Sequence, residues 1–322
     1  MSASRFLHLQ DATIIRPGVG SLEQINFTID ADEQWAVIGE PEGVKTLFLQ
    51  ALAGQAALSR GSLHHDYAAA YLRETAVKEG YRSYRDLLAY VPFHHHFRNR
   101  SNLSQFYYQQ RFNSSDAEEV ATVRDYLNSI QARHGSLIWT VDAVMTLFGL
   151  HALEDEALIM LSNGETRRLM LAAALLRNPR LLLLENPLVG LDQPTRLHFE
   201  YILETIIRSG IHVVMTTTPT EIPECITHVA VLRGNRLLSS GPKHMVNLRD
   251  IQLAGGLLSA DTANDIRQLI RSGRSQRPAT VSPVVELRQV SVRYGERQIL
   301  NHVSWTVEPG EAWCLQGRNG AG

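Results

Sequence analysis

Two segments of the chain repeat each other, and this repeat limits how the chain can be divided into domains. Residues 21–43 align without a gap on residues 299–321 when the numbering is offset by 278. Both segments end in a glycine-containing loop. The identical pairs are Leu22/Leu300, Thr28/Thr306, Glu33/Glu311, Trp35/Trp313 and Gly39/Gly317. We therefore expect one complete unit followed by the first part of a second.

The repeat predicts three parts in the 322-residue chain. Residues 1–240 form the first unit, 241–283 a helical segment and a linker, and 284–322 the N-terminal part of the second unit. Residues 271–283 are rich in Ser, Arg, Gly and Pro without hydrophobic periodicity, which is typical of a linker. The polar and aromatic stretch 99–135 is expected to be a peripheral, partly helical insertion.

Hydrophobic periodicity in the first unit predicts strands that alternate with helices. Strands are expected at 26–29, 35–38, 181–184 and 213–216, and helices at 45–53, 164–176 and 202–207. This order indicates an α/β fold with a largely parallel sheet.

Composition excludes several classes of protein. The chain is 44% hydrophobic and has a net charge of −2, so it carries no strong nucleic-acid signal. No apolar run approaches the ~20 residues of a membrane helix, so no transmembrane segment is expected. Two distant cysteines favour a reducing compartment. We expect a cytoplasmic protein, at most peripheral at the inner membrane.

The sequence GEPEGVKT at 39–46 lies between a predicted strand and a predicted helix. Backbone amides in this context can cradle phosphates, while Lys45 would reach the terminal phosphates and the Thr46 hydroxyl would bind Mg²⁺. Val44 stands where the phosphate-loop pattern has glycine. We expect its bulk to lie near the phosphates. The alternative for this segment alone is an ordinary strand–helix turn with a surface lysine.

Two further motifs follow in order. Ser162 and Glu165 in LSNGE form a capping-box pattern, and the same helix N-terminus could also present Ser162 and Gly164 to a phosphate. The apolar run 181–184 ends in Glu185, an acid in the place where a nucleoside triphosphatase holds Mg²⁺.

Together, these motifs resemble the ABC (ATP-binding cassette) ATPase family, most closely its soluble tandem-cassette members of the molybdenum-transport type. GEPEGVKT resembles the Walker A loop, LSNGE the signature, LLLLENP the Walker B strand and LVGLD the D-loop. The resemblance implies a P-loop NTPase fold: a mostly parallel core sheet, an antiparallel β subdomain and a helical signature subdomain. It implies ATP and Mg²⁺ as ligands. The implied ATP-binding residues of the first unit are Gly39, Glu40, Gly43, Val44, Lys45, Thr46, Ser162 and Gly164, with Thr46 and Glu185 as Mg²⁺ ligands.

The first cassette departs from the family pattern at several positions. Arg16 replaces the adenine-stacking aromatic, and Phe93 replaces an expected glutamine. Asn186 stands at the catalytic-glutamate position and Thr217 at the switch-histidine position. Asparagine can orient a water but cannot take its proton, and loss of a general base costs about 10²- to 10⁴-fold.

The second cassette matches the family better over the part that is present. Its adenine-stacking aromatic is Tyr294, and its loop GRNGAG supplies Gly317, Asn319, Gly320 and Gly322. ABC cassettes pair head to tail, so the resemblance implies a second cassette as partner. We expect an asymmetric pair in which the first loop binds ATP more than it hydrolyses it. The chain reaches Gly322 before the expected Lys and Ser/Thr of the second loop.

The expected function is binding of Mg-ATP coupled to a partner process, as the ATP-binding subunit of a transport system with a separate membrane permease. The resemblance makes a molybdate-type system the candidate. Turnover by this chain is expected to be weak or absent. One alternative is a translation or ribosome-associated factor. Another is a nucleotide-dependent regulator with little hydrolysis.

Overall fold

A computed structural model describes residues 4–73, 82–93, 121–132, 138–189, 191, 193–246, 264–265, 267–269, 283–294 and 297–314. The chain divides into two compact units, Met1–Gln252 and Leu253–Gly322. Each unit is described by itself below.

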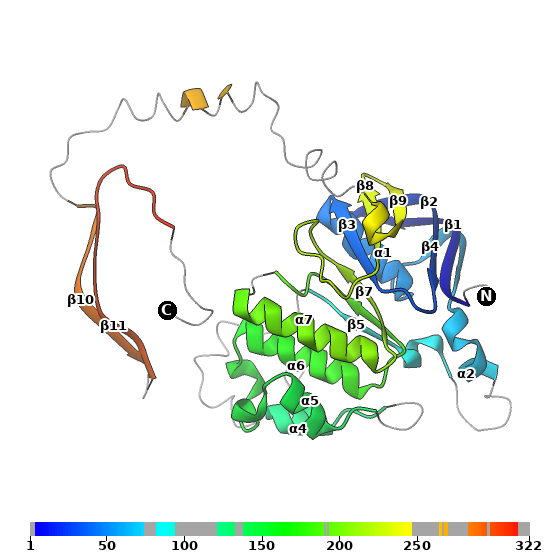
Figure 1. Cartoon of the computed structure of the whole chain (residues 1–322), viewed down its shortest axis with the longest axis horizontal. Helices are drawn as coiled ribbons and strands as arrows, with labels where there is room; N and C mark the ends of the chain where they lie inside the picture. Colours follow the sequence, from blue (N-terminus) through cyan, green and yellow to red (C-terminus); the bar gives the residue numbers. More distant parts are fainter. Residues whose placement is uncertain are drawn as a thin grey trace. The chain divides into compact units, whose positions relative to one another are not determined.

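The first unit is organised around a six-stranded sheet with the strand order β5-β6-β7-β3-β8-β9 (Figure 1). The strands are β3 (Trp35–Glu40), β5 (Leu88–Val91), β6 (Leu181–Leu184), β7 (His212–Thr216), β8 (His228–Arg233) and β9 (Arg236–Pro242). The first five strands in this order, from β5 through β3 to β8, run parallel to one another, and β9 pairs antiparallel with β8. The expected α/β class with a mostly parallel core sheet is confirmed.

An antiparallel sheet of three strands, in the order β2-β1-β4, forms the expected β subdomain. Its strands are β1 (Arg5–Arg16), β2 (Gly20–Asp30) and β4 (Leu58–His64). Helix α1 (Glu42–Leu52) shares one hydrophobic core with this sheet and with one face of the central sheet. Phe48 of α1 is fully buried there and meets Phe27 of β2 edge to face.

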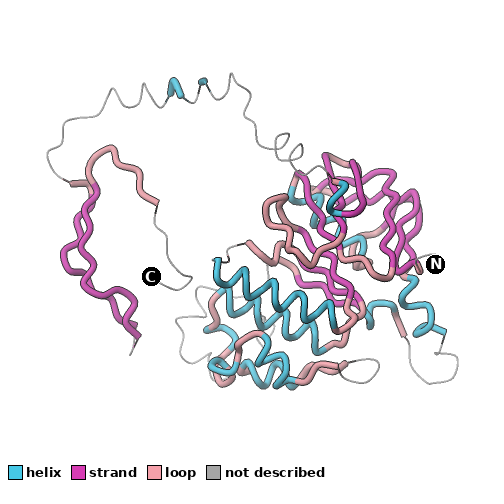
Figure 2. Tube along the Cα trace, in the orientation of Figure 1, coloured by secondary structure: helices cyan, strands magenta, loops and turns pink. Residues whose placement is uncertain are grey.

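The other face of the central sheet is covered by helices, as the tube in Figure 2 shows. They are α4 (Val123–Asn128), α5 (Val141–Leu147), α6 (Asn163–Leu176) and α7 (Gln193–Arg208). Because successive strand residues point to opposite faces, Ala36 and Ile38 of β3 enter this core, whereas Trp35 and Val37 enter the core of α1. The two layers hold the strand ends in fixed positions.

Short helices connect these elements. They are α2 (Ala69–Arg73) and the 3₁₀ turns η1 (Asp66–Ala68), η3 (Tyr84–Leu87), η4 (His151–Leu153), η5 (Leu158–Met160) and η6 (Lys243–Met245).

The expected peripheral insertion is only partly described, and the described part is not peripheral. Helix α4 lies within residues 121–132, and its Val123 and Leu127 are fully buried in the main core. Their spacing of four residues puts both side chains on one helix face. Residues 99–120 and 133–135 of the insertion lie outside the described part of the chain.

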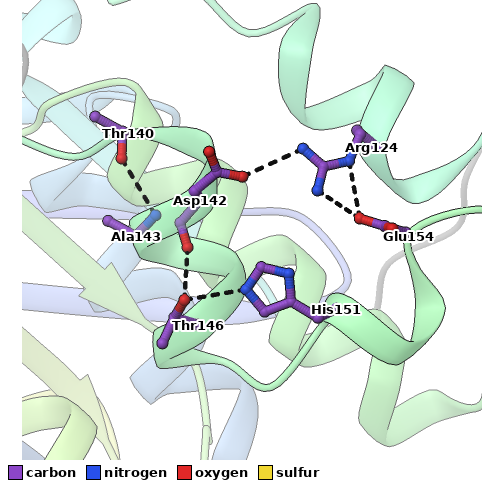
Figure 3. A network of polar contacts seen from close by, with 7 residues as sticks. All are labelled: Arg124, Thr140, Asp142, Ala143, Thr146, His151 and Glu154. Carbon is purple, nitrogen blue, oxygen red and sulfur yellow. Dashed lines mark hydrogen bonds and ion pairs between the residues drawn. The ribbon is translucent and has the colours of Figure 1, made fainter.

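A polar network holds α4 and α5 together in the helical subdomain (Figure 3). The Arg124 guanidinium pairs with Glu154 and also donates to Asp142 over 3.2 Å. Thr140 caps α5 by accepting from the Ala143 amide. These contacts fix the helices against which α6 packs.

The second unit contains a hairpin of β10 (Val285–Tyr294) and β11 (Arg297–Val307). Its register repeats that of β1 and β2 at the offset of 278 over most of its length: Leu7 pairs with Ile29, and Val285 pairs with Val307. The linker lies outside the described residues except for Pro283.

Irregular features of the hairpin repeat as well. Gln289 has a positive φ of 48°, as does its counterpart Asp11 with 45°. The indole N–H of Trp313 donates to Glu311 Oε2 over 3.0 Å, the same contact that Trp35 makes with Glu33. The hairpin part of the repeat is therefore confirmed by backbone conformation and side-chain contacts.

Within the described ranges, no helix combines the length and the apolar character needed to cross a membrane.

Candidate functional site

The carboxyl ends of three neighbouring parallel strands bring the predicted site residues together. Gly39 lies near the end of β3, Glu185 and Asn186 directly follow β6, and Thr217 follows β7. These strands lie in the order β6-β7-β3. In open α/β sheets ligands bind at this edge.

The turn that leaves β3 depends on Gly39. Its φ is +124°, and a Cβ added there would lie 1.8 Å from the carbonyl oxygen of Leu232 on β8. Only glycine fits both the conformation and the close approach. The next residue, Glu40, is exposed and ends β3.

Helix α1 begins three residues earlier than the sequence predicted, at Glu42 rather than Lys45. Only Pro41 remains between β3 and α1, and it occupies the N-cap position. Glu42 lies in the first turn, where a carboxylate interacts favourably with the helix dipole. The first helical turn thus takes up residues 42–44, which were expected to belong to the glycine-containing turn before the helix.

Val44 stands where the phosphate-loop pattern has glycine, and its side chain is buried. Its side chain is 3% exposed and belongs to the core between α1 and the antiparallel sheet. A Cβ added at Gly20 would lie 3.5 Å from a Val44 methyl. The early start of α1 turns this residue towards the β1–β2 connection. Its expected position near the phosphates stays a prediction. Gly43 lies beside Val19 of the same connection.

The Lys45 ammonium is buried and paired within the chain. Its side chain is 4% exposed, and Nζ lies 2.8 Å from Glu42 Oε2. Nζ also donates to the carbonyl oxygen of Thr217 over 3.2 Å. A buried ammonium requires such partners because desolvation of an unpaired charge is costly. The structural alternative of a surface lysine is therefore wrong.

Glu42 also contacts the residue at the catalytic-glutamate position. Asn186 Nδ2 donates to Glu42 Oε1 over 2.6 Å. Asn186 is itself anchored to β7, because its backbone N–H donates to Thr216 Oγ1 over 2.9 Å and its side-chain Oδ1 accepts from the same hydroxyl. Sequence reasoning missed Glu42 as a site residue. The signal was present in the repeat, where Gly320 stands opposite Glu42 at the offset of 278.

The two expected Mg²⁺ ligands contact each other. The Thr46 hydroxyl donates to Glu185 Oε1. The other carboxylate oxygen of Glu185 accepts from the Tyr90 hydroxyl over 2.8 Å and from the Phe93 amide over 3.2 Å. Burial, and secondly the hydrogen bond to Glu185, raises the pKa of Tyr90 above its usual value, so this hydroxyl stays a donor.

These residues fit the two parts of a magnesium–nucleotide ligand unequally. A hydroxyl and a carboxylate oxygen in contact are the ligand types that Mg²⁺ takes, so Thr46 and Glu185 fit the metal. The anion fits less well, because Lys45 and Asn186 already share the carboxylate of Glu42. The charge of Lys45 is thus paired within the chain without a phosphate.

The side chains of Thr217 and Arg16, two predicted site positions, are both engaged in hydrogen bonds within the chain. The Thr217 hydroxyl donates to the carbonyl oxygen of Glu221, so Thr217 faces the site with its backbone carbonyl and not with its side chain. Arg16 is exposed and donates to Gln50 on α1. Its guanidinium is thus held against α1 by a hydrogen bond.

The signature segment forms the exposed N-terminus of α6. Ser162 and Glu165 make both hydrogen bonds of a capping box: the Glu165 amide donates to Ser162 Oγ over 3.3 Å, and the Ser162 amide donates to Glu165 Oε2 over 2.8 Å. A Cβ added at Gly164 would meet nothing within 4 Å. Arg168 anchors α6 by donating to the carbonyl oxygen of Phe148 after α5. The helix N-terminus is therefore held in place, with Ser162 exposed and Gly164 uncrowded.

The predicted residues of the second unit are mostly outside the described part of the chain. Gly317, Asn319, Gly320 and Gly322 are not described. Tyr294 is described only as the backbone end of β10. The structure leaves their assigned roles as predictions.

Comparisons with known proteins agree with this geometry. The model of the ABC transporter family matches residues 22–189, which cover the 39–46 loop, the signature and the end of β6. An uncharacterized ABC transporter ATP-binding protein of Schizosaccharomyces pombe is 25% identical over 322 residues, covering 98% of this chain and 61% of the relative. The ABC transporter ATP-binding protein ModF of Escherichia coli is 28% identical over 314 residues, covering 94% of this chain and 57% of the relative. The chain thus spans about three-fifths of the length of these two relatives.

A solved structure of an ATP-binding subunit of an ABC transporter superposes with a TM-score of 0.57 at 17% identity, covering 81% of this chain and 99% of that one. At this identity the likeness concerns the fold alone. The fold, the order of the motifs and the family match over half of the chain agree. The chain belongs to the ABC transporter family of ATP-binding cassettes.

Proposed function

We propose that this chain is the non-hydrolysing half of a pair of ATP-binding cassettes. The site at its own 39–46 loop lacks a general base, because Asn186 stands at the position of the catalytic glutamate. The side-chain amide of Asn186 donates to Glu42. The N-terminus of α6 instead serves the nucleotide held by a second cassette, in the same polypeptide or in a partner chain. This division matches the asymmetry between the two loops of the repeat.

One observation carries the proposal: the polar side chains of the 39–46 loop are engaged within the chain, whereas the N-terminus of α6 is exposed. In the 39–46 loop Lys45 is paired with Glu42 within the chain, and the Thr46 hydroxyl is hydrogen-bonded to Glu185. The N-terminus of α6, by contrast, presents exposed Ser162 and an uncrowded Gly164. Helix N-termini bind phosphates through their amides and dipole. The cassette is built to contribute to a phosphate site on another cassette.

The site would act mainly by positioning and electrostatics. The amides of the first turn of α6 and the Ser162 hydroxyl would hold phosphate oxygens of the nucleotide on the second cassette. ATP binding would draw the two cassettes together. Because the contribution is made through a fixed helix end, a bulky cation at Ser162 would block it.

We propose further that this pairing drives transport through a separate membrane permease. The support is the similarity to the ABC transporter ATP-binding protein ModF and to the molybdenum import ATP-binding protein ModC of Rhodopseudomonas palustris. The latter is 36% identical over 103 residues. These names favour an oxyanion such as molybdate as the transported substrate. Affinity purification of the full gene product from its own cells is expected to recover an integral membrane protein. Recovery with ribosomal subunits instead would contradict the transport proposal.

The pairing proposal is tested by Ser162→Arg in the full gene product. We expect its ATPase rate to fall about 100-fold, in the range seen when one stabilising donor of a transition state is lost. Ser129→Arg is the matched control, because Ser129 is an exposed residue at the C-cap of α4 in the same helical subdomain. The control is expected to retain the wild-type rate. An unchanged rate in Ser162→Arg would overturn the proposal.

A further inference from the structure

Glu42 holds together the parts of the 39–46 site that a nucleotide would otherwise join. One carboxylate oxygen lies 2.8 Å from Lys45 Nζ, and the other accepts from Asn186 Nδ2 over 2.6 Å. Lys45 continues to the carbonyl oxygen of Thr217, and Asn186 continues to Thr216. The contacts form a closed ring that begins and ends at the carboxyl end of β7.

The two side chains that contact this carboxylate, Lys45 and Asn186, indicate which part of a nucleotide would bind in its place. In a phosphate loop the lysine reaches the β- and γ-phosphates, and the residue at the position of Asn186 faces the group that is transferred. An anion in contact with both side chains therefore lies where a terminal phosphate would bind. The carboxylate of Glu42 is such an anion, and it is part of the chain.

The repeat shows that this acid is not required by the backbone of such a loop. Gly320 is the counterpart of Glu42 at the offset of 278. The offset is supported by matching contacts in the two hairpins, such as those of Trp35 and Trp313. Glycine at this position has no side chain that could reach the lysine.

The replacement at position 186 fits the acid at position 42. An amide donates a hydrogen bond to a carboxylate, whereas a glutamate at position 186 would place two negative charges in contact. The acid at position 42 and the amide at position 186 therefore complement each other. Lys45 uses two of its three ammonium protons in the contacts described, which leaves one for a β-phosphate.

We propose that Glu42 determines the phosphate specificity of the first cassette: its carboxylate takes the place of the terminal phosphate, so the loop binds a nucleoside diphosphate in preference to a triphosphate. This inference rests on the assignment of residues 39–46 as a phosphate loop within the proposed function. It replaces the expectation that this loop retains ATP without hydrolysing it.

The test is equilibrium binding of ADP and ATP, each with Mg²⁺, to the 322-residue chain. We expect the wild type to bind ADP at least ~10-fold more tightly than ATP, which corresponds to one hydrogen-bonded charge contact. Glu42→Gly, which copies Gly320, is expected to tighten ATP binding at least ~10-fold and to change ADP binding less than ~3-fold. Glu42→Gln keeps the size of the side chain and is expected to give a smaller gain for ATP, because only the charge is removed.

Asp32→Gly is the matched control, since it removes an exposed acid outside the 39–46 loop, copies Gly310 of the repeat and leaves Glu42 in place. It is expected to leave the preference for ADP unchanged. Circular dichroism and thermal unfolding establish that each variant is folded before its binding is compared. The inference would be overturned if the wild type bound ADP and ATP with equal affinity, or if Glu42→Gly bound both nucleotides more tightly by the same factor. It would also be overturned if neither the wild type nor Glu42→Gly bound any nucleotide. If Ser162→Arg still abolishes ATPase activity in the full gene product, the proposed function stands even when this inference fails.

Discussion

Asn186 Nδ2 donates a hydrogen bond to Glu42 Oε1 over 2.6 Å, across 144 residues of sequence. This contact joins Glu42, whose counterpart in the repeat is Gly320, to Asn186, which stands at the catalytic-glutamate position of the family. Glu42 also pairs with Lys45, whose side chain is 4% exposed. The first cassette therefore neutralises its Walker A lysine with an acid of its own.

The contact predicts energetic coupling between positions 42 and 186. Asn186→Asp keeps the size of the side chain and tolerates the positive φ of 45°, but it opposes two carboxylates. We expect it to lower the free energy of unfolding by about 1–2 kcal/mol, a modest value because the Glu42 side chain is 58% exposed.

A double-mutant cycle with Glu42→Gln measures this coupling by urea unfolding. In Glu42→Gln the Asn186→Asp change is expected to cost at least ~0.5 kcal/mol less, because one of the two charges is gone. Additive effects in the cycle would contradict the contact.

Gly39 is predicted to be the least replaceable glycine of the site. Gly39→Ala puts a Cβ 1.8 Å from the carbonyl oxygen of Leu232 in a residue with φ of +124°. We expect a loss of about 4 kcal/mol or more, measured by chemical denaturation. Gly43→Ala is the control, because its Cβ would meet Val19 at an ordinary 3.5 Å and alanine favours the helix. Comparable losses in both variants would show that the turn is not built as described.

Ser162 is predicted to have a capping role that can be separated from its role towards phosphate. Ser162→Ala is expected to lower the stability of the chain by about 1 kcal/mol, because the hydrogen bond to the Glu165 amide is lost. Ser162→Asp retains a good N-cap but brings a negative charge to the helix end. We expect unchanged stability of the chain and an ATPase rate of the full gene product lowered about 100-fold. Retained activity in Ser162→Asp would leave Ser162 with capping alone.

Two half-buried histidines predict a loss of stability in mild acid. Burial lowers the pKa of His65 below its usual 6.5, despite the hydrogen bond of its ring to the carbonyl oxygen of Leu52. Burial likewise lowers the pKa of His212, whose ring lies 3.7 Å from that of Phe6. The unfolded chain therefore binds protons more readily than the folded one. Stability is fully present above the unfolded pKa of about 6.5 and falls as the pH decreases below it.

Urea unfolding between pH 5 and 8 checks this dependence. His212→Gln is expected to flatten the slope of stability against pH, by at most ~1.4 kcal/mol per pH unit for one histidine. His244→Gln is a control, because His244 lies in the exposed η6 turn. An identical slope in wild type and His212→Gln would contradict the assignment.

Much of the central sheet could be predicted from the sequence because its strands are short and apolar. The run 181–184 forms β6 with the predicted bounds, since all four leucines are buried on both faces of the sheet. The capping box at Ser162 and Glu165 was likewise a local pattern and is present. Local patterns of this kind need no knowledge of distant residues.

The contacts that decide the state of the site could not be predicted in this way. The partner of Glu42 is 144 residues away, and Thr217, whose carbonyl receives Lys45, is 172 residues from that lysine. The direction of Val44 depends on where α1 begins, and a shift of three residues turns its side chain into the core. Helix boundaries are the least certain part of a prediction from sequence.

The central claim is that the first cassette pairs Lys45 with its own Glu42 and does not take Mg-ATP as a resident ligand. Thermal unfolding of the 322-residue chain with and without Mg-ATP tests it most directly. A ligand at about 100 times its Kd stabilises a protein by about 2.7 kcal/mol, which raises the Tm of a domain of this size by roughly 5–10 °C. We predict that Mg-ATP at ~1 mM shifts the Tm of the wild-type chain by less than about 1 °C. A rise of about 5 °C or more would contradict the account.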